Sequence, residues 1–167
     1  MSVLVIVESY FGCTWRIGEA IATAVPDATL LRSDDAPTVV DPSVRLVILG
    51  APTHAFTLPT DSSRTDAARR RSTGADAAHA AGFDASRRGV REWIAAAEIP
   101  ATARVVTFDT AAGAWAALGR SSRKAARRLR AAGVDAKTGP SFRVTTDDVL
   151  RDGECERAAA WAGGLAD

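Results

Sequence analysis

The first 25 residues strongly limit the folds that this chain can adopt. An apolar run at residues 3–7 is followed by a short loop of small, hydroxylated and aromatic residues and then by a helical pattern at residues 14–25. Because a strand that is buried on both faces need not alternate polar and apolar residues, this order indicates a parallel strand, a loop and a helix. Such a loop directs unpaired backbone N–H groups and the positive end of the helix dipole toward one point. The segment therefore predicts a binding site for a phosphate group.

The same alternation of apolar runs and helical patterns continues along the chain. The sequence predicts further strands at residues 28–31, 46–50, 104–108 and 141–144, and further helices at residues 88–97, 121–132 and 155–165. Strands and helices in this order require a parallel sheet with helices on both faces and right-handed crossovers. We therefore expect an α/β fold, a three-layer, doubly wound, five-stranded parallel sheet, formed by residues 1–167 as a single domain.

A long polar segment follows the third predicted strand. Residues 57–87 are rich in alanine and arginine, and a connection of this length is usually functional or partly disordered. Residues 66–71 and 76–81 have the composition of short helices. We expect a helical insert after strand 3 that borders the binding site.

The amino-acid composition limits the classes of function that this chain can have. The net charge of +1 gives no reason to expect a nucleic-acid partner. No stretch of eighteen apolar residues occurs, and no basic region precedes the first apolar run, so we expect neither a membrane span nor a signal peptide, and a cytoplasmic location. Basic residues gather at Arg120, Arg123, Lys124, Arg127, Arg128 and Arg130. This group is either a solvated helix surface or a patch for an anion or a partner.

Two motifs carry a resemblance to a known family. The loop Ser9-Tyr10-Phe11-Gly12-Cys13-Thr14 resembles the phosphate loop of flavodoxin-like FMN-binding proteins, which runs Ser/Thr-x-x-Gly-Asn-Thr. The segment Gly50-Ala51-Pro52-Thr53-His54-Ala55-Phe56 is similar to the Gly-x-Pro-Thr-His-x-Phe form of that family's first isoalloxazine loop. A third, weaker similarity is the strand that opens at Asp109 and Thr110 into the loop expected on the other side of the flavin. The likeness covers nearly the whole chain.

The resemblance implies a strand order, a cofactor and a set of contacts. The order would be 2-1-3-4-5, with the ligand beyond the carboxyl ends of strands 1 and 3. The cofactor would be FMN, and the residues expected to bind it are Ser9, Tyr10, Phe11, Gly12, Cys13, Thr14, Pro52, Thr53, His54, Ala55, Phe56, Asp109, Thr110 and Trp115. We assign no catalytic residue, and the two cysteines and two histidines form no cluster that predicts a metal site.

Several of these residues have a second interpretation. Ser9 and Thr14 are also suited to capping an ordinary helix. Cys13 stands where the family usually has asparagine, and its thiol either packs as a neutral group beneath FMN or is a reactive, redox-sensitive group. Phe11 and Trp115 contact the flavin or pack against the protein itself.

Two functions remain open at the level of the sequence. The first is an FMN-binding protein that acts in electron transfer or as a small flavin-dependent oxidoreductase, with a redox partner protein and homodimer formation as its interactions. The alternative is a protein of the same fold that has lost FMN and serves as a binding or regulatory module. The fold alone does not distinguish them.

Overall fold

The computed structural model describes residues 2–53, 57–70, 84–113 and 120–166. Its five strands form one parallel sheet in the order β2-β1-β3-β4-β5, which confirms the expected topology. The strands are β1 (Ser2–Val7), β2 (Ala28–Arg32), β3 (Val44–Pro52), β4 (Arg104–Ala112) and β5 (Ala136–Val144). The helices are α1 (Cys13–Ala24), α2 (Asp61–Arg70), α3 (Val90–Ala96), α4 (Ser121–Ala131) and α5 (Glu154–Ala166).

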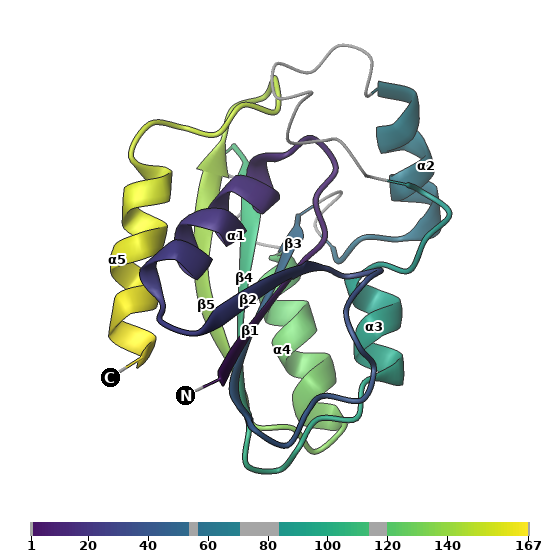
Figure 1. Ribbon diagram of the computed structural model, residues 1–167. Coiled ribbons are helices and arrows are strands. Elements are labelled where there is room, and N and C mark those ends of the chain that lie inside the picture. The colour runs from purple at the N-terminus through teal and green to yellow at the C-terminus, as the bar shows by residue number, and fades with distance from the viewer. Residues whose placement is uncertain (1, 54–56, 71–83, 114–119, 167) are drawn as a thin grey trace.

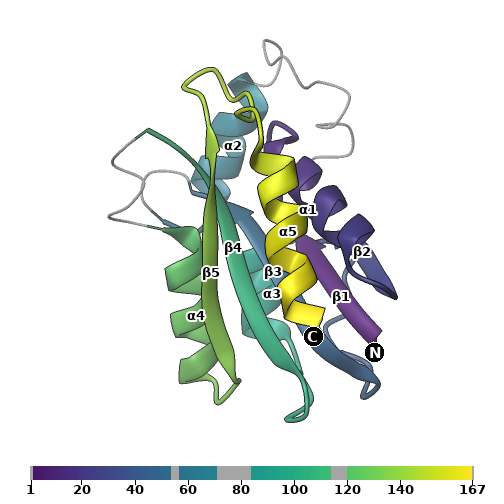
Figure 2. The same ribbon diagram turned by 90° about the vertical axis from the view of Figure 1, so that its left-hand side faces the viewer.

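Helices cover both faces of the sheet. Helices α1 and α5 lie on one side, and α3 and α4 lie on the other (Figure 1, Figure 2). Ile17 and Ile21 of α1 are fully buried in a cluster that includes Ile48 of β3. Trp93 of α3 and Leu129 of α4 belong to the cluster on the opposite face. Burial of these apolar side chains on both faces explains why the inner strands are continuous apolar runs.

Helix α2 lies outside the three layers. It belongs to the expected helical insert and sits beyond the end of the sheet at which the parallel strands terminate (Figure 1). It begins at Asp61, five residues before the predicted helix at 66–71, because Thr60 and Ser63 exchange hydrogen bonds at its start. The second predicted helix, at 76–81, lies outside the described residues.

The other elements match their predictions with small shifts at the ends. The largest difference is β5, which starts at residue 136 instead of 141. In the part of the chain that the structure describes, no helix is long and apolar enough to cross a membrane.

Candidate functional site

The N-terminus of α1 is open to an anion. Gly12 precedes the helix with φ of 94°, a left-handed conformation that glycine adopts without strain. No side chain among the described residues caps this end, and the first turn carries no acidic residue. The positive end of the helix dipole is therefore not neutralised by its own helix.

This helix end opens into a cavity of about 250 Å³. The cavity lies beyond the carboxyl ends of the strands, where ligands bind in doubly wound sheets. Its walls come from the first loop, the ends of β3 and β4, helix α2 and the segment after β5. The lining residues are Tyr10, Phe11, Cys13, Thr14, Pro52, Thr53, Arg70, Thr110, Ala111, Ala112, Val144, Thr146 and Asp148. We call this space the loop cavity.

The loop cavity brings together half of the residues predicted to bind the cofactor. Those that line it are Tyr10, Phe11, Cys13, Thr14, Pro52, Thr53 and Thr110. Thr14 and Thr110 join the start of α1 to β4 through a hydrogen bond of 2.7 Å between their hydroxyl oxygens. Both residues are buried at the cavity wall, which places two hydrogen-bonding groups at one point beside the start of α1.

Two of the predicted residues support α4. The Asp109 carboxylate accepts hydrogen bonds from the Ser122 backbone N–H at 3.0 Å and from its hydroxyl at 2.6 Å, and it does not line the cavity. Thr53 Oγ1 accepts the Ser121 N–H at 3.0 Å. Both side chains satisfy donors at the start of α4 that have no partner within the helix.

Ser9 lies on a different side of the first loop. Its hydroxyl is buried and has no hydrogen-bond partner among the described residues. It lines a separate space of about 20 Å³, which has room for about one water molecule. The remaining predicted residues, His54, Ala55, Phe56 and Trp115, lie outside the described part of the chain.

The Cys13 side chain is a hydrogen-bond donor. Its Sγ donates to the backbone oxygen of Asp148 at 2.9 Å. A carbonyl oxygen can only accept, so this contact needs the protonated thiol. The geometry favours the neutral, packed interpretation of Cys13 over the reactive thiolate.

Helix α2 reaches over the loop cavity through Arg70, a residue that was not among those predicted to bind the cofactor. Arg70 pairs with the Asp148 carboxylate at 2.9 Å, and its guanidinium lies 5.4 Å from the centre of the Phe11 ring. The end of α2 is thereby joined both to the first loop and to the segment after β5. Arg70 and its partner Asp148 both line the loop cavity, so this pair brings a cation together with a balancing carboxylate to the cavity edge.

A buried ion network holds the other end of α2. Arg64 is only 2% exposed, and its Nε lies 2.8 Å from Oε1 of Glu8, which is 4% exposed. The second Glu8 oxygen accepts the Val90 N–H at 2.8 Å, and Arg64 also pairs with Glu92. Burial raises the pKa of the Glu8 carboxyl, while the Arg64 charge and the two hydrogen bonds oppose that rise.

Gly89 makes this network possible. A Cβ atom at this position would overlap the Arg64 guanidinium and lie 2.5 Å from Glu8 Oε2. The only signal for the network in the sequence is a charged residue, Glu8, directly after a buried strand. Its partners Arg64 and Val90 are 56 and 82 positions away, so no local pattern identifies them.

No cluster of metal-binding side chains occurs in the described residues. The loop cavity offers hydroxyl groups, helix N–H groups and aromatic rings for a ligand that contains an anionic group. These are the features that a phosphate-bearing organic molecule requires.

Comparison with known proteins supports the architecture. No family model matches the sequence, and no curated protein matches it. A flavodoxin from the domain Archaea is similar in structure, with a TM-score of 0.63 and 12% identity over 99% of this chain and 96% of that one. Flavodoxin 1 from Bacillus cereus gives a TM-score of 0.61 with 15% identity over 97% and 95%. Rubredoxin oxygen:oxidoreductase from Desulfovibrio gigas gives 0.55 with 14% identity, and 99% of this chain matches 35% of that one. The chain therefore has a flavodoxin-like fold.

Proposed function

We propose that this protein binds FMN non-covalently and takes part in electron transfer. The observation that carries the proposal is the uncapped N-terminus of α1, which opens into the loop cavity at the carboxyl ends of the strands. The structural similarity to two flavodoxins supports the proposal, because the helix end and the cavity lie within the fold that the chain shares with them. FMN would supply the redox chemistry, and the protein would supply binding, orientation and electrostatics.

The phosphate of FMN would lie against the start of α1. The backbone at Gly12 and Cys13 would donate to its oxygens, and the Thr14 hydroxyl would turn toward it from its present partner, Thr110. A protonated Cys13 thiol avoids repulsion between a thiolate and the phosphate dianion. Phe11 and Tyr10 would add aromatic surface beside the ligand.

The flavin ring would extend toward the loops after β3 and β4. Pro52, Thr53 and Thr110 form the described part of that wall. We keep His54, Ala55, Phe56 and Trp115 as proposed ring contacts and Ser9 as a proposed loop contact. Asp109 would act on the ligand only through the position of α4.

A redox partner completes the proposed function. The chain has a net charge of +1, so overall charge does not select a strongly basic or strongly acidic partner. Of the large apolar side chains in the described residues, only Val39 is exposed, and this surface does not identify an apolar dimer face. A homodimer remains a proposal that rests on the resemblance, and a cytoplasmic location remains a proposal that rests on the sequence pattern.

Titration with FMN tests the proposal. Purified protein should quench the fluorescence of added FMN and shift its visible absorption bands. The variant Thr14→Val keeps the side-chain volume and removes the hydroxyl, and we expect it to weaken FMN binding by about tenfold, the effect of one hydrogen bond to a charged group. Thr29→Val, at an exposed position of β2, is the matched control and should bind as the unmodified protein does.

Two results would contradict this proposal. If the protein leaves FMN fluorescence unchanged at high micromolar concentrations, the alternative of a module that has lost FMN is favoured. If FMN binds with equal affinity to Thr14→Val and to the unmodified protein, the phosphate does not lie at the Thr14 hydroxyl.

A further inference from the structure

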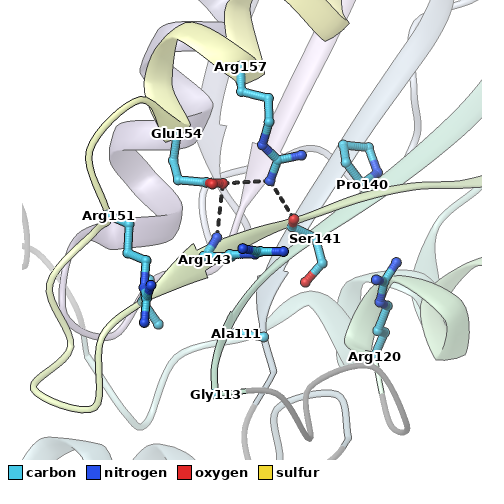
Figure 3. Close-up of a pocket in the computed structure, with 10 residues that line it drawn as sticks. Ala111, Gly113, Arg120, Pro140, Ser141, Arg143, Arg151, Glu154 and Arg157 are labelled. Atoms are coloured by element: carbon cyan, nitrogen blue, oxygen red, sulfur yellow. Dashed lines mark hydrogen bonds and ion pairs between the residues drawn. The ribbon is translucent and has the colours of Figure 1, made fainter.

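A second and larger cavity lies beside the loop cavity, against the edge strand β5. Its volume is about 850 Å³. Figure 3 shows arginine side chains that enter this region from four places: the start of α4, strand β5, the β5–α5 segment and α5. The lining residues are Ala111, Gly113, Arg120, Pro140, Ser141, Arg143, Val144, Arg151, Glu154 and Arg157. We call this space the arginine pocket.

The charges of the arginine pocket are not balanced. Its only acidic residue among those described, Glu154, already pairs with Arg157 at 2.5 Å and accepts the Arg143 backbone N–H at 3.0 Å. The guanidinium groups of Arg120, Arg143 and Arg151 have no hydrogen-bond or ion-pair partner among the described residues. In the part of the chain that the structure describes, three positive charges around one cavity are thus left without a counter-charge.

Arg120 supplies an independent sign of a missing ligand. Its Nε is buried, and no described residue accepts a hydrogen bond from it. A buried donor without an acceptor costs free energy, and the cost is larger when the group is charged. An anion in the pocket would remove that cost, because a guanidinium donates two parallel hydrogen bonds to a carboxylate or a phosphate.

Arg157 is already held in place. Its guanidinium donates to the Ser141 carbonyl oxygen at 2.6 Å and lies 4.5 Å from the centre of the buried Phe142 ring. The ion pair with Glu154 adds a third restraint. This part of the wall is therefore preorganised, which lowers the entropy cost of binding a ligand.

We propose that the arginine pocket binds a small organic anion that carries at least two phosphate or carboxylate groups. The volume falls in the range of about 300–1,000 Å³ that is typical of small-molecule sites, which favours a small molecule over a flat protein surface. Ala111, Pro140 and Val144 give the pocket apolar wall, which suits an organic body between the charged groups. The inference goes beyond the proposed flavin function and does not require it.

The arginine pocket lies next to the loop cavity. Ala111 and Val144 line both cavities, so the arginine pocket and the loop cavity share a wall. A ligand in one lies directly beside a ligand in the other.

Calorimetric titration of the full chain tests this inference. The probes are pyrophosphate and citrate, each added at pH 7 and at one fixed ionic strength, since exposed charges are screened by salt. We expect at least one probe to bind, and preference between them identifies phosphate or carboxylate as the recognised group. Arg143→Gln and Arg151→Gln should each weaken binding by about tenfold, because each loses a charge-assisted hydrogen bond. Both residues are exposed, so neither substitution disturbs the core.

Two control variants separate binding in this pocket from attraction to overall charge and from binding in the loop cavity. Arg127→Gln removes the same charge from an exposed position on α4 outside the pocket and should leave the affinity unchanged. Thr14→Val changes the loop cavity alone, so it should weaken FMN and not the probe that binds the arginine pocket. Failure of the flavin proposal and failure of this one are therefore distinguishable.

Three outcomes would overturn the inference. The first is that neither probe binds at millimolar concentration, which would leave an acidic protein surface as the alternative occupant. The second is that Arg127→Gln weakens binding as much as Arg143→Gln, which would indicate attraction to overall charge. The third is that Arg143→Gln and Arg151→Gln both bind the probe with the affinity of the unmodified protein.

Discussion

At position 13 a thiol stands where the resemblance expects an amide. The Cys13 thiol donates one hydrogen bond, to the Asp148 carbonyl oxygen. Asparagine has a similar size and carries two amide donors, so it can keep this contact and offer a second donor to an anion at the start of α1. One additional hydrogen bond to a charged group is worth about 1.5–3 kcal/mol.

We therefore expect Cys13→Asn to bind FMN about tenfold more tightly than the unmodified protein, measured by fluorescence quenching. Cys155→Asn, in the first turn of α5, is the control and should have no effect on affinity. Weaker binding by Cys13→Asn would mean that the side chain at this position packs beneath the ligand and does not reach its phosphate.

The types of residue at the site could be predicted from the sequence, but the directions in which their side chains point could not. Thr14 lies in the first turn of α1 and Thr110 near the end of β4, and the structure brings their hydroxyls together at the cavity. Asp109 stands next to Thr110 in the sequence and points to the opposite side, where α4 has unsatisfied N–H groups. Successive side chains of a strand face opposite ways, and only the tertiary structure shows which face meets a helix end.

The sheet and its covering helices were predictable from the sequence, because buried apolar runs and amphipathic helices have clear patterns. Strand β5 was predicted only from residue 141, since Lys137 and Thr138 are exposed and Pro140 lacks an N–H group. All three are tolerated because β5 is an edge strand with a single neighbour. The attachment of α2 was not predictable, because it depends on ion pairs between distant residues.

Arg64 gives a test of that attachment. Removing one partner of a buried ion pair leaves the other charged and unpaired, at a cost of about 3–5 kcal/mol. We expect Arg64→Met to lower the free energy of unfolding at pH 7 by about that amount, measured with chemical denaturant. Arg69→Met, on the same helix at a position 77% exposed, is the control and should change stability by less than about 1 kcal/mol.

The effect of Arg64→Met should depend on pH. Burial already raises the pKa of the Glu8 carboxyl, and loss of Arg64 removes the main opposing charge, so the pKa in the folded variant rises further. A carboxyl group whose pKa is higher in the folded than in the unfolded protein stabilises the folded state at pH values below its unfolded-state pKa. This stabilisation is lost as the pH increases through its folded-state pKa. The variant should therefore be less destabilised near pH 4 than at pH 7. An equal loss at both pH values would show that Glu8 is not the group left unpaired.

At the scale of the whole molecule, the loop cavity and the arginine pocket lie at the same end of the sheet. A ligand in either cavity would therefore stabilise the same part of the folded protein. A ligand that binds only the folded protein stabilises it by mass action, by about 2.7 kcal/mol at a concentration one hundred times its Kd. In a chain of this size, FMN at that concentration should raise Tm by about 5–10 °C in a calorimetric scan. Riboflavin, which lacks the phosphate, should give a much smaller shift. Equal shifts would show that the start of α1 does not hold the phosphate.

Ion pairs hold helix α2 in place, and the helix contributes few apolar side chains to the core. Its buried residues are Ser63, Arg64 and Ala67, and Arg70 pairs with Asp148 at its far end. A segment with few buried apolar contacts opens at a lower free energy than the sheet. In amide hydrogen exchange, α2 should therefore exchange faster than β3. Added salt should speed exchange further at the C-terminal end of α2, where it screens the more exposed Arg70–Asp148 pair, while β3 is unaffected. Exchange at the same rate in both elements would mean that α2 unfolds only with the whole protein. If α2 opens on its own, the first loop exchanges between a covered and an uncovered form, and the balance between the two shifts with ionic strength through the Arg70–Asp148 pair.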